Sequence, residues 1–319
     1  MAANNGEPET LCPIIGVLCI DVSQKLNEIY GPQIKSYIAA SYVKWLEGAG
    51  GRVVPIWIGR GKNYYANIMA KINGVLIPGG AVFFSSKYVT SPELRNDCVQ
   101  SSQFIYEIAA QLNAIGEYFP IWGTCLGMEL LLLHSAKGVD PRQDCTHMNC
   151  ALPVVFTKDF RKSKLFDTLT PELENIMQSE PFGYHFHRYC ITEDDLRQFK
   201  INNDWHVLAT NKDENGLEFI SILEHQRYPF YGVQFHPEKV RYEQHGASDK
   251  CCHSPTAIQA AQYLVDFFVH ECRKSTNSFT SNDEELAHFI WNFEVTYTGR
   301  HMKQWMQCYM FGDAPDYSN

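Results

Sequence analysis

The sequence predicts an α/β protein: a three-layer sandwich with a mostly parallel central sheet that antiparallel strands extend. Two observations support this prediction. In the first half, short apolar runs alternate with segments of helical periodicity, a pattern typical of parallel strands joined by right-handed crossovers. In the second half, strand-like runs follow one another with only turn residues between them, which predicts antiparallel pairing. With 319 residues, 45% of them hydrophobic, the chain has ample material for a core.

Four short apolar runs are the expected parallel strands, at residues 13–20, 52–58, 72–80 and 118–124. Each is almost continuously apolar, as suits a strand that is buried on both faces. In sheets of this kind, ligands bind beyond the carboxyl ends of the strands. The glycines that end the third run and the cysteine that follows the fourth therefore lie where a site is expected.

Helices are expected between these strands. One should cover the apolar residues that recur every fourth position, which are Ile34, Ile38, Tyr42 and Leu46. It should end at the glycines of "EGAGG", because glycine permits the turn that closes a helix. A second helix is expected over residues 93–112.

The antiparallel strands are expected within residues 206–213, 216–225 and 228–238, separated by the turn residues of "DENG" and "RYP". A long helix should follow. Ser254 is a good N-cap for it, and Pro255 fits the first helical position.

The chain is expected to form a single domain over residues 13–274, after a flexible N-terminus at 1–12. Residues 275–319 are expected to be an extension that starts with a polar linker. Its aromatic residues include Phe289, Trp291, Phe293 and Tyr297. That much aromatic area favours packing against the domain, because it would be costly to leave in water.

Composition excludes several functional classes. The net charge is −9 and no basic stripe is present, so nucleic acid is not an expected partner. No apolar run approaches the length of a membrane span. The polar first ten residues lack the features of a signal peptide.

The 11 cysteines have irregular spacing, so buried thiols are the expected state for most of them. "CTHMNC" at 145–150 and "CCH" at 251–253 suggest metal binding, but neither supplies four ligands at a recognised spacing. We therefore expect no metal and no other cofactor.

Cys125 is the candidate nucleophile. It lies in "GTCLG", residues 123–127, between an apolar strand and a Leu-rich helix, which is the form of a nucleophile elbow. The helix N-terminus favours a thiolate. The N–H of Leu126 is one expected donor to an oxyanion. Gly79 or Gly80, at a neighbouring strand end, fits as the second donor, and Gly80 is the one we assign. A buried structural cysteine is the alternative for an isolated thiol, but the flanking glycines favour the elbow.

His236 is the candidate base. It lies in "GVQFHPE" at a strand end, and Glu238 is two residues further on. Alternation along an extended segment would place these two side chains on one side. Glu238 can then orient His236, and His236 can deprotonate Cys125. The alternative is a loop histidine beside a solvated glutamate.

These two motifs together resemble the glutamine amidotransferase-like superfamily, whose fold is flavodoxin-like. Within it the chain is similar to the gamma-glutamyl hydrolases of peptidase family C26. The similar segments are "SYIAASYVKWLEGAGGRVVPI", "INGVLIPGG", "YFPIWGTCLGMELL", "YPFYGVQFHPEK" and "YTGRHMKQWMQCYMFGD". They span nearly the whole chain in the family's order. The first and last are more specific than the two catalytic motifs, which the superfamily shares.

The resemblance implies an omega-peptidase that hydrolyses folylpoly-gamma-glutamates and antifolate polyglutamates through a thioester. It implies no cofactor, a homodimer, and a lysosomal, vacuolar or extracellular location, with the cytoplasm as the alternative because no signal peptide is visible. Glu129 stands where glutamine amidotransferases usually have glutamine. His187, in "FHRY", matches a family histidine and is either a pocket residue or a structural one.

A polyanionic substrate needs cations, and the candidates are Arg188, Lys239 and Arg241, although each has the alternative of a solvated surface charge. Two other functions stay open. One is a glutaminase subunit that supplies ammonia to a partner synthetase, against which Glu129 argues. The other is a non-catalytic binding protein, against which an intact Cys125, His236 and Glu238 argue.

Overall fold

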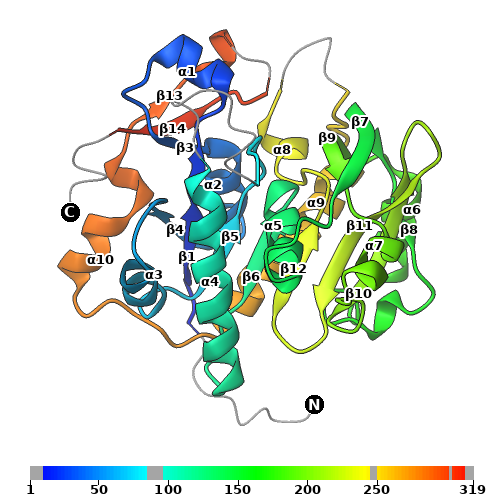
Figure 1. Ribbon diagram of the computed structural model, residues 1–319, viewed down its shortest axis with the longest axis horizontal. Coiled ribbons are helices and arrows are strands. Elements are labelled where there is room, and N and C mark those ends of the chain that lie inside the picture. The colour runs from blue at the N-terminus through cyan, green and yellow to red at the C-terminus, as the bar shows by residue number, and fades with distance from the viewer. Residues whose placement is uncertain (1–9, 85–95, 245–249, 302–303, 313–319) are drawn as a thin grey trace.

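A computed structural model describes residues 10–84, 96–244, 250–301 and 304–312 of the chain. Its centre is an eight-stranded sheet (Figure 1). The strands, in spatial order, are β4 (Arg52–Ile56), β1 (Ile14–Leu18), β5 (Gly74–Ile77), β6 (Ile121–Thr124), β12 (Phe230–Val233), β11 (Glu218–His225), β10 (Trp205–Lys212) and β8 (Val155–Phe156).

The predicted division of the sheet is confirmed. The strands from β4 to β12 are parallel neighbours, and β11, β10 and β8 continue the sheet in antiparallel pairs. β1 and β5 are buried at every position, as continuous apolar runs require. The parallel strands therefore end at one common edge, where β5 leads to Gly79 and β6 leads to Cys125.

Helices cover both faces of this sheet, which gives the predicted three layers (Figure 1). On one face α3 (Lys62–Met69), α4 (Asp97–Ala114) and α5 (Leu126–Ser135) pack together. On the other, α9 (Pro255–Arg273) packs against α2 (Ala40–Glu47), α6 (Pro171–Ser179) and α8 (Lys239–Tyr242). The described residues also form α1 (Gln24–Tyr30), α7 (Glu193–Gln198), α10 (Asn282–His288) and the short 3-10 turns Phe160–Lys162, Ile290–Asn292 and Thr298–Arg300.

The expected helix ends are partly confirmed. Ser254 accepts the N–H of Ala257 and Pro255 is the first residue of α9. α4 begins at Asp97, inside the helix predicted at 93–112, and continues two residues beyond it to Ala114, whereas residues 93–95 are outside the described part.

The prediction of one helix from Ile34 to Leu46 is wrong in its first half. Residues Ser36–Ala39 form strand β3, and α2 begins only at Ala40. β3 pairs with β2 (Ile20–Asp21) on one side and β14 (Cys308–Phe311) on the other. These hydrogen bonds come from distant parts of the chain, so the local helical spacing could not reveal them.

Two smaller sheets border the main one. β13 (Val295–Thr296) joins β14, β3 and β2, while β7 (Gln143–Leu152) pairs with β9 (Gly183–Cys190). β14 thus links the end of the chain to β3. Both sheets stand near the carboxyl edge of the parallel strands, where they can supply walls to a site.

The aromatic residues of the C-terminal segment are buried to very different degrees. Phe289 is buried, and the ring of Phe293 contacts those of Trp57 and Phe311. Trp291 and Tyr297 are 60% and 50% exposed. The expected linker has no regular structure up to the start of α10 at Asn282. The backbone oxygens of Ser275 and Asn277 in this linker accept hydrogen bonds from the side-chain amide of buried Asn73.

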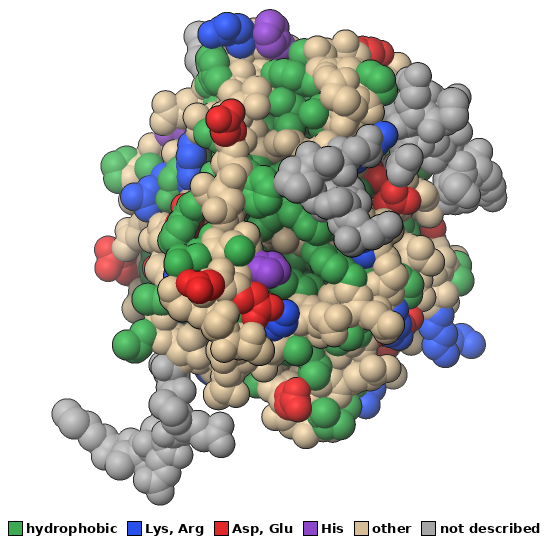
Figure 2. All heavy atoms as spheres, turned by 90° about the vertical axis from the view of Figure 1, so that its left-hand side faces the viewer, with side chains coloured by type: hydrophobic (Ala, Val, Ile, Leu, Met, Phe, Trp, Pro, Cys, Tyr) green, Lys and Arg blue, Asp and Glu red, His purple; other side chains and the backbone are tan. Residues whose placement is uncertain are grey.

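Charged side chains of both signs are spread over the face in Figure 2, with hydrophobic side chains between them. The cysteines of the described residues are not joined in disulfides, and most of them are buried. Among the described residues, no helix combines the length and the apolar character that crossing a bilayer demands.

Candidate active site

Cys125 occupies a strained turn between β6 and α5. Its backbone has φ 52° and ψ −108°, a conformation that is costly for a residue with a side chain. The N–H of Cys125 donates to Val233 O on the neighbouring strand at 2.7 Å. A side chain at Gly127 would overlap the carbonyl oxygen of Ile77, and one at Gly123 would overlap the backbone of Gly127. The two glycines therefore let α5 pack closely enough on the sheet to form the turn.

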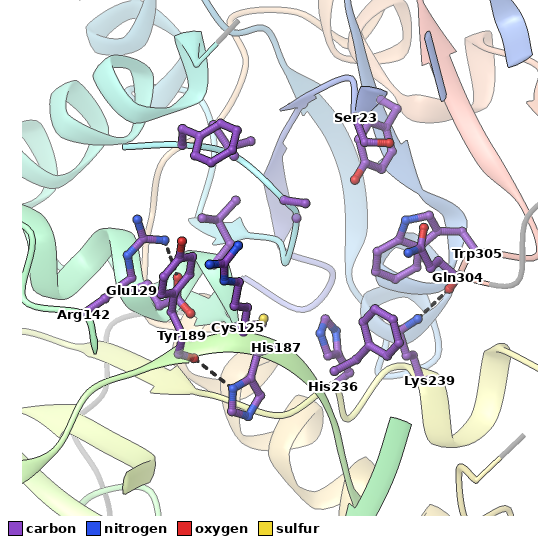
Figure 3. A pocket seen from close by; sticks show the side chains of 18 residues that line it. Ser23, Cys125, Glu129, Arg142, His187, Tyr189, His236, Lys239, Gln304 and Trp305 are labelled. Atoms are coloured by element: carbon purple, nitrogen blue, oxygen red, sulfur yellow. Dashed lines mark hydrogen bonds and ion pairs between the residues drawn. The ribbon is translucent and has the colours of Figure 1, made fainter. Parts of the chain in front are cut away.

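His236 lies beside this thiol. Its backbone N–H donates to Tyr184 O on β9 at 2.8 Å, which fixes the segment after β12. A methyl group on Gly79 would stand 2.6 Å from His236 Cε1 and 3.3 Å from Cys125 Cβ, so both side chains flank the same point. Figure 3 shows the sulfur of Cys125 directed toward His236.

Glu238 contacts the far side of the His236 ring. Its Oε1 is 2.8 Å from His236 Nδ1, and the carboxylate is fully buried. A carboxylate can only accept, so Nδ1 carries the proton and Nε2 is left as an acceptor. The contact was expected from alternation along a strand, but the route differs: β12 ends at Val233, and Glu238 is the N-cap of α8.

Tyr42 completes this group, although its helical spacing predicted only a core residue. Its buried hydroxyl accepts the N–H of Gly79 at 2.8 Å and lies 3.2 Å from His236 Nδ1. It also hydrogen-bonds Glu238. The N–H of Gly79 is therefore used by Tyr42. Gly80, the next residue, lines the cavity beside Cys125 and Leu126.

The surroundings of Cys125 favour the thiol over the thiolate. Burial raises the pKa of Cys125 well above its ordinary value, and the carboxylates of Glu129 and Glu238 act in the same direction. The N–H of Leu126 donates to the sulfur and, with Lys239, opposes this rise without overcoming it. The helix N-terminus was expected to favour the thiolate. It does lower the pKa of Cys125 through the N–H of Leu126, but by less than burial raises it.

Glu129, one helical turn after Cys125, is buried at the cavity wall. Gln234 Nε2 donates to its Oε1 at 3.1 Å, and the guanidinium of Arg142 contacts its Oε2 at 3.0 Å. Neither partner was predicted. Gln234 lies inside the quoted "GVQFHPE" motif, so its position next to His236 was the available signal, whereas Arg142 follows a proline in a polar turn that gave none.

Of the other predicted binding residues, some line the cavity and one does not. His187 lines the cavity, with Nδ1 2.8 Å from Tyr189 O and Nε2 3.0 Å from His185 Nδ1. The candidate cations also differ in position. Arg188 lines the cavity mouth, with a side chain 73% exposed and an ion pair to Asp144, whereas Arg241 does not line the cavity.

Lys239 is a buried cation of the cavity on the side opposite Arg142. Its Nζ lies 3.7 Å from the centre of the Trp305 ring and donates to Gln304 O at 2.5 Å. The Trp305 ring also meets the His236 ring edge-on at 6.0 Å. The segment before β14 therefore forms one wall of the cavity.

The cavity has a volume of about 290 Å³ and opens over Cys125 (Figure 3). Arg142, Glu129 and Tyr189 lie on one side of the sulfur in this view, and Lys239, Gln304 and Trp305 on the other. In the described part of the chain, no three or more histidine, cysteine or carboxylate side chains gather as metal ligands would.

A cysteine at a strand-to-helix elbow, beside a histidine whose other nitrogen meets a buried carboxylate, is the arrangement of a cysteine-type hydrolase. Comparison with known proteins agrees with this class. The family model described as peptidase C26 matches residues 13–238. The chain belongs to the peptidase C26 family and is a hydrolase of the cysteine type.

Several curated relatives are similar over most of their length. The gamma-glutamyl hydrolase of Homo sapiens is 38% identical, over 94% of this chain and 89% of the relative. That of Bos taurus is 37% identical over the same shares, and gamma-glutamyl hydrolase B of Dictyostelium discoideum is 36% identical over 90% and 79%. Among solved structures, a glutamine amido transferase from Methylobacillus flagellatus has a TM-score of 0.45 at 11% identity, covering 86% of this chain and 99% of that one.

Proposed function

We propose that this enzyme hydrolyses gamma-glutamyl bonds of folylpoly-gamma-glutamates, including antifolate forms. The contact of the buried Glu238 with His236, on the ring that adjoins Cys125, is the observation that carries the proposal. The names of the relatives, gamma-glutamyl hydrolases at up to 38% identity, support the bond that is cleaved.

In the proposed first step, the sulfur of Cys125 attacks the gamma-carbonyl carbon of a glutamyl residue. His236 Nε2 takes the thiol proton, and Glu238 stabilises the imidazolium through Nδ1. The carbonyl oxygen becomes an oxyanion that accepts from the N–H groups of Leu126 and Gly80. One such donor is worth about 3–4 kcal/mol of barrier.

The second step breaks the C–N bond. The departing amine takes the proton from His236, and the glutamyl carbonyl is left as a thioester on Cys125. Water, deprotonated by the same imidazole, then attacks the thioester. The products are a free gamma-carboxylic acid and the regenerated thiol, so no electrons are transferred and no cofactor is needed.

Two cations suit the alpha-carboxylates of such a substrate. Lys239 offers a buried ammonium next to Trp305, and Arg188 offers an exposed guanidinium at the mouth. His187 is proposed to line the pocket rather than to transfer a proton, because both its ring nitrogens already have hydrogen-bonding partners. A homodimer and a lysosomal, vacuolar or extracellular location stay predictions from the family resemblance.

The test is product chromatography after incubation with a folate pentaglutamate. We expect release of gamma-linked glutamates by the wild type and none by Cys125→Ala, with an unchanged circular-dichroism spectrum. Cys12→Ala, which removes an exposed thiol, is the matched control and should retain full activity. A folded Cys125→Ala protein that keeps its activity, or a wild type that cleaves glutamine but no gamma-Glu-Glu bond, would overturn the proposal.

A further inference from the structure

Arg142 is a buried cation on the cavity wall whose role the proposed mechanism leaves open. Its side chain is 7% exposed and lies between two aromatic rings, 3.2 Å from the centre of Phe84 and 4.6 Å from that of Tyr189. Nε and one terminal nitrogen donate to the two oxygens of Asp140 at 3.0 Å each. The other terminal nitrogen donates to Glu129 at 3.0 Å. All three nitrogens of the guanidinium therefore donate hydrogen bonds, which hold it in one orientation.

A continuous set of contacts runs from this guanidinium to the nucleophile. Glu129 receives Arg142 on Oε2 and Gln234 Nε2 on Oε1, and the same Nε2 lies 3.9 Å from Cys125 Sγ. Gln234 is completely buried. The orientation of its amide therefore decides whether nitrogen or oxygen faces the thiol.

The charge of Glu129 sets that orientation. An ionised carboxylate only accepts hydrogen bonds, so it holds the NH₂ end of Gln234 toward itself and toward the sulfur. A protonated carboxyl can donate, and it can then hold the amide in the opposite orientation. The amide oxygen would in that case face Cys125 and accept its S–H, in competition with His236.

We propose that Arg142 is a positioning residue that keeps Glu129 ionised and thereby keeps the amide oxygen of Gln234 away from the catalytic thiol. This role rests on the proposed function of Cys125 and His236. Arg142 acts only through Glu129 and Gln234, so it contributes orientation rather than a group that touches the reacting atoms.

The surroundings of Glu129 make a cation necessary. Burial raises the pKa of Glu129, and Asp140 adds to the rise, whereas Arg142 and Gln234 lower it. The thiol of Cys125 faces Glu129 from one turn earlier. The other ionisable groups that line the cavity are Tyr37, His187, Arg188, Tyr189, His236 and Lys239. A buried carboxylate without its partner cation is strongly disfavoured, so loss of Arg142 should protonate Glu129.

The experiment measures kcat/KM against pH for wild type and Arg142→Leu. Without the guanidinium, the acid limb should move to higher pH by about one to three units, the usual effect of an adjacent opposite charge, while activity recovers above it. In a Glu129→Gln background the same substitution should shift the limb no further. Arg227→Leu, which removes an exposed guanidinium paired with Asp204, is the matched control and should leave the profile unchanged.

Arg142→Lys keeps the charge and guards against failure of the leucine variant to fold; it should give a smaller shift. An acid limb that stays in place in the folded Arg142 variants, or one that moves equally in the Glu129→Gln background, would overturn the proposal. If Cys125→Ala is inactive while the Arg142 variants show no shift, only this inference fails. If Cys125→Ala is active, the proposed function itself fails.

Discussion

At the scale of single residues, the contact between Glu238 and His236 Nδ1 decides which nitrogen faces the thiol. Glu238→Gln would place an amide beside Nδ1 whose NH₂ end favours the wrong tautomer. We expect kcat for a gamma-Glu-Glu substrate to fall about 10²–10⁴-fold, the usual size of general acid–base catalysis, with the fold retained.

Glu224→Gln is the matched control for this prediction. Glu224 is also a buried carboxylate, but it accepts the N–H groups of Lys164 and Leu165, away from the cavity. Its loss should lower the free energy of unfolding and leave kcat near that of the wild type. Equal kcat values for the two variants would contradict the role given to Glu238.

The sequence motifs contained Cys125, His236 and Glu238, because glycine spacing and the short "FHPE" segment are local signals. Tyr42 and Arg142 could not be found in this way. Tyr42 reaches His236 across 194 residues, and Arg142 reaches Glu129 only after the turn at residues 136–142 has folded back. Their hydrogen bonds depend on tertiary packing, which no local pattern encodes.

At the scale of elements, the close approach of α5 to β5 depends on Gly127. A methyl group there would overlap Ile77 O, a backbone atom that cannot rotate away. We expect Gly127→Ala to lower the free energy of unfolding by about 1–3 kcal/mol and to reduce kcat, because α5 carries the N–H of Leu126. Urea unfolding and steady-state kinetics provide the two measurements.

Gly61→Ala is the comparison for that substitution. A methyl group at Gly61 meets nothing within 4 Å, and its φ of −68° suits any residue. As the N-cap of α3 it should cost below about 1 kcal/mol. A Gly127→Ala protein as stable as Gly61→Ala would show that the elbow has room for a side chain.

Elements were predictable where one local signal dominated, as in the buried parallel strands and α9. β3 was not, because Ile34, Ile38, Tyr42 and Leu46 have helical spacing although the first two precede the helix. Hydrogen bonds to β2 and β14 outweigh that periodicity. The segment therefore runs as a strand to Ala39 and turns into α2, which carries Tyr42 toward the site.

At the scale of the whole molecule, stability should depend on a buried neutral histidine. His225 Nδ1 accepts the N–H groups of Arg227 and Tyr228. Burial lowers the pKa of His225 to about 4, although Asp204 acts in the opposite direction. The unfolded chain, with a pKa of about 6.5, binds the proton first. This contribution is therefore complete above pH 6.5 and is lost as the pH falls toward 4.

His225→Asn retains an acceptor but does not titrate. Between pH 7 and pH 5 we expect the wild type to lose about 2 kcal/mol more unfolding free energy than this variant. Urea titrations at both pH values measure the difference. Gln226→Asn, at a neighbouring exposed and neutral side chain, should follow the wild type; a His225→Asn protein that does the same would refute the prediction.

The segment that follows α10 also supplies a wall of the cavity. Trp305 covers His236 and Lys239, and β14 holds β3 in place. A nascent polypeptide that has emerged only as far as α9 already contains its thiol and its imidazole but not that wall. The cavity is therefore complete only when a segment 65 residues beyond Lys239 has packed against it.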